Sequence, residues 1–151
     1  MKNTTLCYIE KDEKYLMLHR TKKDNDENHD KWIGVGGKFE NGESPYDAAR
    51  REIFEETGLS AEKLNYRGIV TFVSDIYDTE YMHLFTCKDF HGNILAECNE
   101  GELRWIDKKD VYSLPIWEGD KIFFRLIEGE RDFFSLKLVY EGDNLVSHTI
   151  E

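Results

Sequence analysis

Apolar residues gather in short runs separated by polar turns, a pattern that predicts a domain built mainly of strands. The first two runs, Thr4–Ile9 and Tyr15–His19, flank the turn-like segment Lys11-Asp12-Glu13. Later runs are rich in β-branched and aromatic residues, which favour extended structure. These later predicted strands are Trp32–Val35, Tyr66–Val73, Tyr81–Cys87, Glu102–Ile106, Phe133–Tyr140 and Leu145–Ile150.

Polar segments between the runs predict the connections. The stretch Asp24–Lys31 is polar throughout and is expected to be a loop. A polar bend is predicted at Ser74–Glu80 and a turn at His91-Gly92-Asn93. The sequence Glu141-Gly142-Asp143-Asn144 separates the last two runs, so it predicts a hairpin with a tight turn.

One helix is specified by its end signals. Ser44 is a good N-cap, and Pro45 suits the first helical position because the N–H it lacks has no partner there. Asp47 adds a favourable charge in the first turn, and Gly58 fits the residue just past the end. We therefore predict a helix over Pro45–Thr57.

Two more helical segments follow later in the chain. Lys108–Tyr112 is expected to form one helical turn. Lys121–Ile127 fits a helix with its apolar residues on one side. Strands outnumber helices and are mostly joined by short turns, while the helix over Pro45–Thr57 crosses over. This pattern predicts an α+β fold with a mixed sheet between helices.

At 151 residues, the chain is expected to form a single domain, residues 1–151. No composition shift, internal repeat or low-complexity tract suggests a linker. The formal net charge of −11 argues against a binder of duplex nucleic acid, which would need a basic stripe. An acidic chain binds phosphates locally, through metal ions and a few placed cations.

The cysteines and the absence of long apolar runs bear on the compartment. Cys7, Cys87 and Cys98 are an odd number without a C-x-x-C spacing, which favours reduced thiols over a disulfide framework. The sequence shows no signal peptide and no apolar run long enough to span a bilayer. We therefore expect a cytoplasmic protein without a membrane partner.

Three carboxylates lie close together on the predicted helix. Glu52 is four residues from Glu56 and three from Glu55. Like charges at this spacing weaken an isolated helix by about 0.2–0.5 kcal/mol per pair. Either Arg50 and Arg51 neutralise them on a solvated face, or a hard divalent cation does. Mg²⁺ prefers such oxygen ligands, and the segment has no Cys or His that would favour zinc.

Glycines before this helix make a ligand site more plausible than a solvated face alone. Gly34, Gly36 and Gly37 allow a ligand or cation to approach the bare backbone closely. Two other glycine-rich motifs are excluded. The phosphate-binding G-x-x-x-x-G-K-[ST] is missing, and Phe39 stands where G-x-G-x-x-G would need its third glycine.

Residues Gly37–Leu59 follow the pattern G-x₅-E-x₇-R-E-U-x-E-E-x-G-U, where U is aliphatic. This segment resembles the Nudix box. The resemblance implies the layered Nudix fold and a hydrolase of nucleoside diphosphates linked to another moiety X, dependent on Mg²⁺ or Mn²⁺. The positions that carry it are Gly37, Glu43, Arg51, Glu52, Ile53, Glu55, Glu56, Gly58 and Leu59.

The resemblance also implies roles. Glu52 and Glu56 are the main metal ligands and Glu55 assists, while a backbone carbonyl around Gly36 and Gly37 completes the metal shell. Arg51 pairs with Glu43 and orients the neighbouring carboxylates.

A further carboxylate from outside the box is expected to approach the metals and act as general base. Glu97, Glu100 and Glu102 are the candidates. Glu100 is preferred because it precedes Gly101 in the loop before a predicted strand.

Similarity extends beyond the box. Trp32-x-Gly-x-Gly-Gly-Lys38, Glu100–Trp105 and Leu114–Asp120 look like the MutT-type branch, which clears oxidised purine nucleoside triphosphates. This implies hydrolysis of substrates such as 8-oxo-dGTP to the monophosphate and pyrophosphate, with Lys38 and the adjoining glycines at the substrate.

The base-binding residues are implied less completely. Trp117 provides a flat stacking surface, and Asp120 can hydrogen-bond a purine edge. The mammalian 8-oxo-dGTPase of this branch has Asn at the position of Ile33 and Asp at that of Gly119. These two departures leave the phosphate chemistry intact and weaken the expected discrimination between bases.

A basic cluster follows the second predicted strand. Arg20, Lys22 and Lys23 are either solvated or help to hold phosphates, since they are among the few cations near the acidic site. Two other functions remain open. One is a Nudix hydrolase of a nucleotide sugar or dinucleotide, and the other is a Nudix-fold binding module without catalysis.

Overall fold

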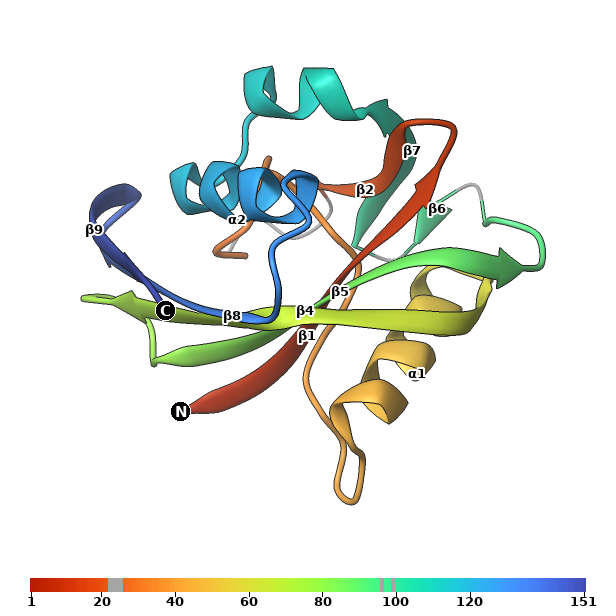
Figure 1. The fold of residues 1–151 in the computed structure, drawn as a ribbon, viewed down its shortest axis with the longest axis horizontal. Coiled ribbons are helices and arrows are strands. Elements are labelled where there is room, and N and C mark those ends of the chain that lie inside the picture. Colours follow the sequence, from red (N-terminus) through yellow and green to blue (C-terminus); the bar gives the residue numbers. More distant parts are fainter. Residues whose placement is uncertain (22–25, 96, 99) are drawn as a thin grey trace.

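The computed structural model describes residues 1–21, 26–95, 97–98 (backbone only) and 100–151. Its elements alternate between strands and a few helices (Figure 1). In chain order they are β1 (Lys2–Lys11), β2 (Lys14–Arg20), β3 (Trp32–Ile33), α1 (Pro45–Thr57), β4 (Ser60–Ser74), β5 (Glu80–His91), β6 (Glu97–Cys98), β7 (Gly101–Asp107), the 3₁₀ helix η1 (Lys108–Ser113), α2 (Glu118–Glu128), β8 (Phe134–Glu141) and β9 (Asn144–Ile150).

The described strands form one mixed sheet in the order β6-β7-β2-β1-β5-β4-β8-β9, with β3 paired to β2. The pairs β1–β5 and β4–β8 are parallel and the other pairs are antiparallel. Parallel partners cannot be joined by a tight turn, so each pair is separated in sequence by other elements. The predicted mixed sheet is confirmed.

Helices cover both faces of the sheet (Figure 1). Because side chains alternate along a strand, β1 contributes to two cores. Cys7 and Ile9 pack with Ala49 and Ile53 of α1. On the other face, Tyr8 joins a core that includes Phe123 and Phe124 of α2. The predicted layering, with a sheet between helices, is therefore present.

Helix α1 has the bounds that its end signals predict. Ser44 Oγ accepts from the Asp47 N–H, and the Asp47 carboxylate accepts from the Ser44 N–H, which makes a capping box. Gly58 ends the helix with φ 80°, a left-handed conformation that glycine adopts without strain. The two caps thus fix where α1 begins and ends. The bounds of the helix in turn set the positions of its carboxylates.

Some element bounds differ from those predicted. Strand β4 begins at Ser60 rather than Tyr66, because the polar segment before Tyr66 pairs with the end of β5 through bulges. Helix α2 begins at Glu118 rather than Lys121. Strand β6 was not predicted, and the loop predicted over Asp24–Lys31 is described only from residue 26 onward.

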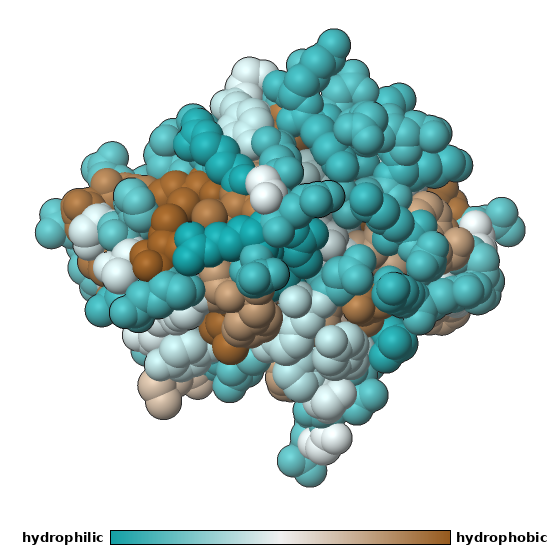
Figure 2. Space-filling view, in the orientation of Figure 1, coloured by the Kyte–Doolittle hydropathy of each residue, from teal (hydrophilic) through white to brown (hydrophobic). Residues whose placement is uncertain are grey.

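The molecular surface is largely hydrophilic in the view of Figure 2, which suits the acidic composition. A hydrophobic area lies at the left, where Figure 1 places α2 and β9. Within the described residues, no helix is both long and apolar enough to cross a membrane.

Candidate functional site

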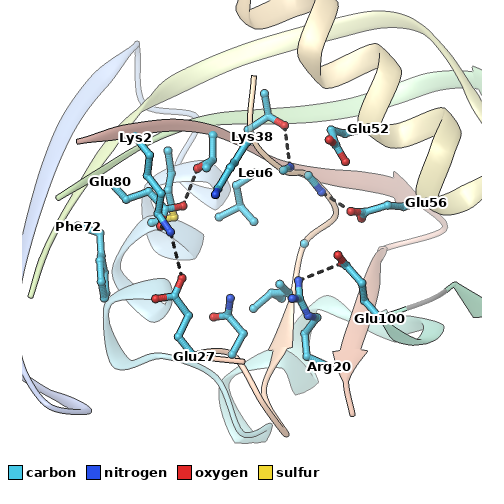
Figure 3. Close-up of a pocket in the computed structure, with 18 of the residues that line it drawn as sticks. Lys2, Leu6, Arg20, Glu27, Lys38, Glu52, Glu56, Phe72, Glu80 and Glu100 are labelled. Carbon is cyan, nitrogen blue, oxygen red and sulfur yellow. Dashed lines mark hydrogen bonds and ion pairs between the residues drawn. The ribbon is translucent and has the colours of Figure 1, made fainter. Parts of the chain in front are cut away.

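A cavity of about 590 Å³ lies where α1, the loop that contains Gly34, Gly36 and Gly37 (the glycine loop) and the start of α2 approach the sheet. Figure 3 shows Glu52, Glu56 and Glu100 along one side of it and Phe72 on the opposite side. Trp117, Asp120, Leu138 and Tyr140 also line the cavity. One pocket therefore combines a carboxylate-rich region with an aromatic one.

Glu56 is a buried carboxylate on the acidic side of the pocket. Its side chain projects from α1 into the pocket and is buried, with 8% of its surface exposed. Burial raises the Glu56 pKa to about 9, and the charges of Glu100 and then Glu52 add to this effect. The Gly36 N–H donates to Glu56 Oε2 at 3.2 Å. An uncompensated negative charge here is costly, so the position favours a proton or a cation.

Arg51 binds the acidic residues around it. Its guanidinium donates to both oxygens of Glu43, at 2.7 and 2.9 Å. It also donates to Glu52 Oε1 at 2.8 Å and to Glu55 Oε2 at 3.2 Å. The hydrogen bonds from Arg51 lower the pKa of Glu43. The predicted pairing of Arg51 with Glu43 is present, and the same guanidinium orients two of the expected metal ligands.

The glycine loop packs too tightly for side chains. A Cβ at Gly36 would lie 2.0 Å from the carbonyl oxygen of Thr5. At Gly37 it would lie 2.7 Å from Glu52 Oε1, so the bare backbone lets the Glu52 carboxylate approach. The Gly37 carbonyl accepts from the Thr5 N–H at 2.9 Å. This contact fixes the direction of the Gly37 carbonyl and leaves its second lone pair.

Glu100 is the candidate base that lies in the pocket. Gly101, where a Cβ would be 1.8 Å from the His19 carbonyl oxygen, lets β7 pair closely with β2. That pairing brings Glu100 beside Arg20, whose Nη1 lies 3.1 Å from Glu100 Oε2. Arg20 Nε is also 2.7 Å from Asp26 Oδ2. Arg20 thereby holds the carboxylate near Glu56.

The other two candidate bases are placed differently. Glu102 pairs with Arg104 at 2.6 Å, its side chain is 46% exposed, and it does not line the pocket. The Glu97 side chain lies outside the described residues. Lys22 and Lys23, expected near the phosphates, also lie outside them. Lys38 does line the pocket.

Whether these residues suit a divalent metal depends on their donors and on how the donors are held. Across the described residues, no three acidic, histidine or cysteine side chains are already gathered closely enough to hold a metal. Glu52 faces Arg51, Glu56 faces the Gly36 N–H, and Glu100 faces Arg20. Hard carboxylate oxygens that repel one another in a half-enclosed pocket nevertheless suit Mg²⁺ or Mn²⁺. Arg51 engages only Oε1 of Glu52 and Gly36 only Oε2 of Glu56, so each of these carboxylates has a second oxygen that can face a cation.

The aromatic region is formed largely by α2 and the residues just before it. Trp117 is buried and lies edge-on to Phe72 and Tyr140, with ring centroids 5.5 and 5.0 Å away. Its Nε1 donates to Asn28 Oδ1 at 2.7 Å, and Lys31 Nζ lies 4.4 Å from the ring centroid. The indole is therefore held rigidly at the pocket.

Asp120 is the buried acid of this region, with 5% of its surface exposed. Burial raises its pKa to about 8, and the charge of Lys31 opposes the shift. Within the described part of the chain, no hydrogen bond or ion pair engages its carboxyl group. Ile33 also lines the pocket. Gly119 lies beside it, because its N–H donates to Tyr140, another lining residue. Both positions that differ from the mammalian 8-oxo-dGTPase are therefore at the pocket.

Sequence reasoning missed several pocket residues. The sequence indicates Arg20 only as a member of a basic cluster. It indicates Phe72 and Tyr140 only as residues of predicted strands. Lys2 lies 3.4 Å from Glu80 and 3.5 Å from Glu27 at the pocket margin (Figure 3). Membership of the pocket depends on strand order, which no local pattern in these segments reveals.

Comparison with known proteins gives concordant matches. A sequence model of the NUDIX domain matches residues 2–127. The chain is 32% identical over 124 residues to an uncharacterized Nudix hydrolase, YvcI, of Bacillus subtilis, covering 80% of this chain and 75% of the relative. It is 32% identical over 123 residues to an oxidized purine nucleoside triphosphate hydrolase of Danio rerio, covering 80% and 78%. The crystal structure of a MutT protein from Bacillus halodurans superposes with a TM-score of 0.89 at 26% identity, covering 100% of this chain and 98% of that one.

Proposed function

Because the chain belongs to the Nudix family and is a hydrolase, we propose that it is a metal-dependent nucleoside triphosphate pyrophosphohydrolase of the MutT type. Its substrate would be a purine nucleoside triphosphate, with 8-oxo-dGTP as the leading candidate, and its products the monophosphate and pyrophosphate. The family and fold predicted from Gly37–Leu59 are confirmed. The similarity to the oxidized purine nucleoside triphosphate hydrolase of Danio rerio supports the choice of substrate class.

The observation that carries the proposal is the composition of one pocket. Carboxylates from α1 and Glu100 line one side, and the indole of Trp117 with Asp120 lines the aromatic region. A nucleoside triphosphate has the matching parts, because its phosphate chain requires cations and its base is flat and carries polar edges.

The phosphate side would be organised by a divalent cation. Glu52 and Glu56, assisted by Glu55, Glu100 and the Gly37 carbonyl, are the residues that would hold it. When bound, Mg²⁺ or Mn²⁺ supplies charge neutralisation on the phosphates and lowers the pKa of an attacking water.

The chain's own residues supply orientation and a proton acceptor. The Arg51 guanidinium donates hydrogen bonds to Glu52 and Glu55 and orients both carboxylates. It is itself held by the Glu43 carboxylate. Glu100, held by Arg20 on the same side of the pocket as Glu56, is the residue we assign to accept the proton of the attacking water. Lys38, and by the sequence also Lys22 and Lys23, would contact the phosphates.

The aromatic region would hold the base. Trp117 offers a stacking surface that is already fixed by Asn28. No hydrogen bond or ion pair from the described residues engages the carboxyl group of Asp120, so it is available to a polar edge of the base. Burial of a flat base here would orient the phosphate chain toward the carboxylates.

The test is product identification with a panel of nucleotides. The purified chain with Mg²⁺ is incubated with 8-oxo-dGTP, dGTP, a nucleotide sugar and a dinucleotide. Equal amounts of nucleoside monophosphate and pyrophosphate from a triphosphate support the proposal. A sugar phosphate formed while the triphosphates stay intact would assign the chain to the alternative substrate class.

A further inference from the structure

The hydroxyl group of Tyr140 lies next to the base region of the pocket. Tyr140 belongs to β8, is 1% exposed and lines the cavity. Its ring packs against Trp117 at 5.0 Å and against Phe72 at 5.2 Å between centroids. It is therefore rigidly placed beside the two aromatic residues of this region.

One hydrogen bond determines whether the Tyr140 hydroxyl can still act as a donor. The Gly119 N–H donates to Tyr140 Oη at 2.7 Å. Gly119 lies in the first turn of α2, where N–H groups lack partners within the helix. Trp117, the N-cap, makes no capping bond with its side chain. Tyr140 thus serves as acceptor for the helix, and no described residue accepts its hydroxyl hydrogen, which can therefore be donated to a bound ligand.

The Tyr140 hydroxyl occupies the space that a side chain at position 119 would fill. A Cβ at position 119 would lie 2.8 Å from Tyr140 Oη and 2.4 Å from Leu138 Cδ1. A side chain at 119 would displace the phenol, so the absence of one leaves room for the hydroxyl. The next residue is Asp120, whose buried carboxyl group has no hydrogen bond to any described residue. A hydroxyl donor and a carboxyl group are therefore neighbours in the pocket.

We propose that Tyr140 and Asp120 together read the edge of a 6-oxopurine, with Tyr140 as a specificity-determining residue. The Tyr140 O–H donates to the carbonyl oxygen of the base, and Asp120 accepts from the adjacent ring N–H. A 6-aminopurine presents N–H groups to the Tyr140 donor instead, so it leaves that donor unpaired. The assignment rests on the proposed function for the base site and adds the choice between two purines.

A purely structural role, as a cap for α2, is the competing explanation for Tyr140. Loss of a cap would lower stability and affect all nucleotides alike. If Tyr140 recognises the base, its removal changes the ratio of the affinities for two bases. If Tyr140 only caps α2, the ratio stays constant, because the cap contributes equally to both complexes.

The test is isothermal titration calorimetry of the whole chain with dGMP and with dAMP, without divalent metal. The wild type should bind dGMP more tightly. Tyr140→Phe should weaken dGMP binding about tenfold, as expected for one lost hydrogen bond that leaves a base carbonyl unpaired, and change dAMP binding less than about twofold. Tyr15→Phe removes a buried hydroxyl from the same core but outside the cavity, and it should change neither.

A second variant guards against misfolding of the first. Gly119→Ala keeps the phenol but pushes its hydroxyl aside, so it should lower the dGMP-to-dAMP affinity ratio in the same direction. The proposal is overturned if the wild type does not prefer dGMP, or if both variants leave the ratio within about twofold of wild type. Binding is measured without turnover, so absence of pyrophosphate release would defeat the proposed function separately.

Discussion

Arg51 and Glu43 form a two-bond ion pair, with Nε 2.7 Å from one carboxylate oxygen and Nη2 2.9 Å from the other. The pair spans the loop before α1 and leaves Nη1 of the same guanidinium to hold Glu52 at 2.8 Å. A bidentate Arg–carboxylate pair fixes direction as well as distance. The loop and the expected metal ligand are thereby oriented together.

Replacing Arg51 should therefore weaken metal binding. Arg51→Ala is expected to lower metal affinity and activity by roughly 10–100-fold, the usual cost of losing a partner that orients a ligand. Arg50→Ala is the matched control, because Arg50 is an exposed cation on the same helix. Titration of activity with Mg²⁺ measures the effect. An unchanged Mg²⁺ dependence in Arg51→Ala would make Arg51 only a surface cation.

The burial of Glu56 predicts how stability depends on pH without metal. Its pKa of about 9 lies above the ordinary value of 4.5, so the folded state binds a proton that the unfolded state releases between these values. Stability of the metal-free protein should fall as pH rises from about 4.5 to about 9. Glu56→Gln should flatten this fall.

Melting temperatures across that range in EDTA test this prediction. The exposed Glu55 provides the control variant, since Glu55→Gln should leave the pH dependence in place. Mg²⁺ should raise the melting temperature of the wild type, because a cation that binds the folded state stabilises it, and raise that of Glu56→Gln less. Identical pH profiles for wild type and Glu56→Gln would refute the account of this carboxylate.

Asp120 should matter for purines in particular. Asp120→Ala is expected to lower kcat/KM for purine triphosphates far more than for pyrimidine triphosphates, because we propose that its carboxyl group binds a purine edge. Because Ile33 has no donor or acceptor, 8-oxo-dGTP should be separated from dGTP less sharply than at a site with an amide there. Rates with 8-oxo-dGTP, dGTP, dATP, dCTP and dTTP check both points. A pyrimidine as best substrate, or equal slowing of all five, would remove Trp117 and Asp120 from base binding.

The packing around Gly119 predicts a stability effect. Gly119→Ala places a Cβ against Leu138 and Tyr140, and overpacking of this kind costs about 1–3 kcal/mol. Gly129→Ala is the control, since the nearest atom to its Cβ would be 3.3 Å away. Urea unfolding of both variants measures the difference. Equal urea midpoints for the two variants would show that Leu138 and Tyr140 move aside for the added methyl group without loss of stability.

Local signals in the sequence predicted the bounds of α1 and the place of Glu100 better than they predicted the bounds of the surrounding strands. The bounds of α1 follow from Ser44, Pro45 and Gly58, whose effects are confined to one turn of helix. Glu100 was preferred because of Gly101, and the close pairing of β7 with β2 at that glycine does bring Glu100 to the pocket.

Other features depend on distant partners, so no local pattern revealed them. The residues before Tyr66 are polar and become strand only by pairing with the end of β5. Tyr140 looks like one more apolar strand position, and it reaches the pocket only because β8 lies under the first turn of α2. The position of Arg20 beside Glu100 likewise requires the sheet order.

The central claim is that Glu52 and Glu56 hold the ions for pyrophosphate release from a nucleoside triphosphate. The most direct measurement is kcat for 8-oxo-dGTP at saturating Mg²⁺, with monophosphate and pyrophosphate quantified, for wild type, Glu52→Gln and Glu56→Gln. We predict equal amounts of both products from the wild type and a fall in kcat of several orders of magnitude in each variant, with folding retained. A variant that keeps more than about a tenth of wild-type kcat, a barrier change below roughly 1.4 kcal/mol, would contradict the role of that glutamate. Orthophosphate in place of pyrophosphate would contradict the reaction itself.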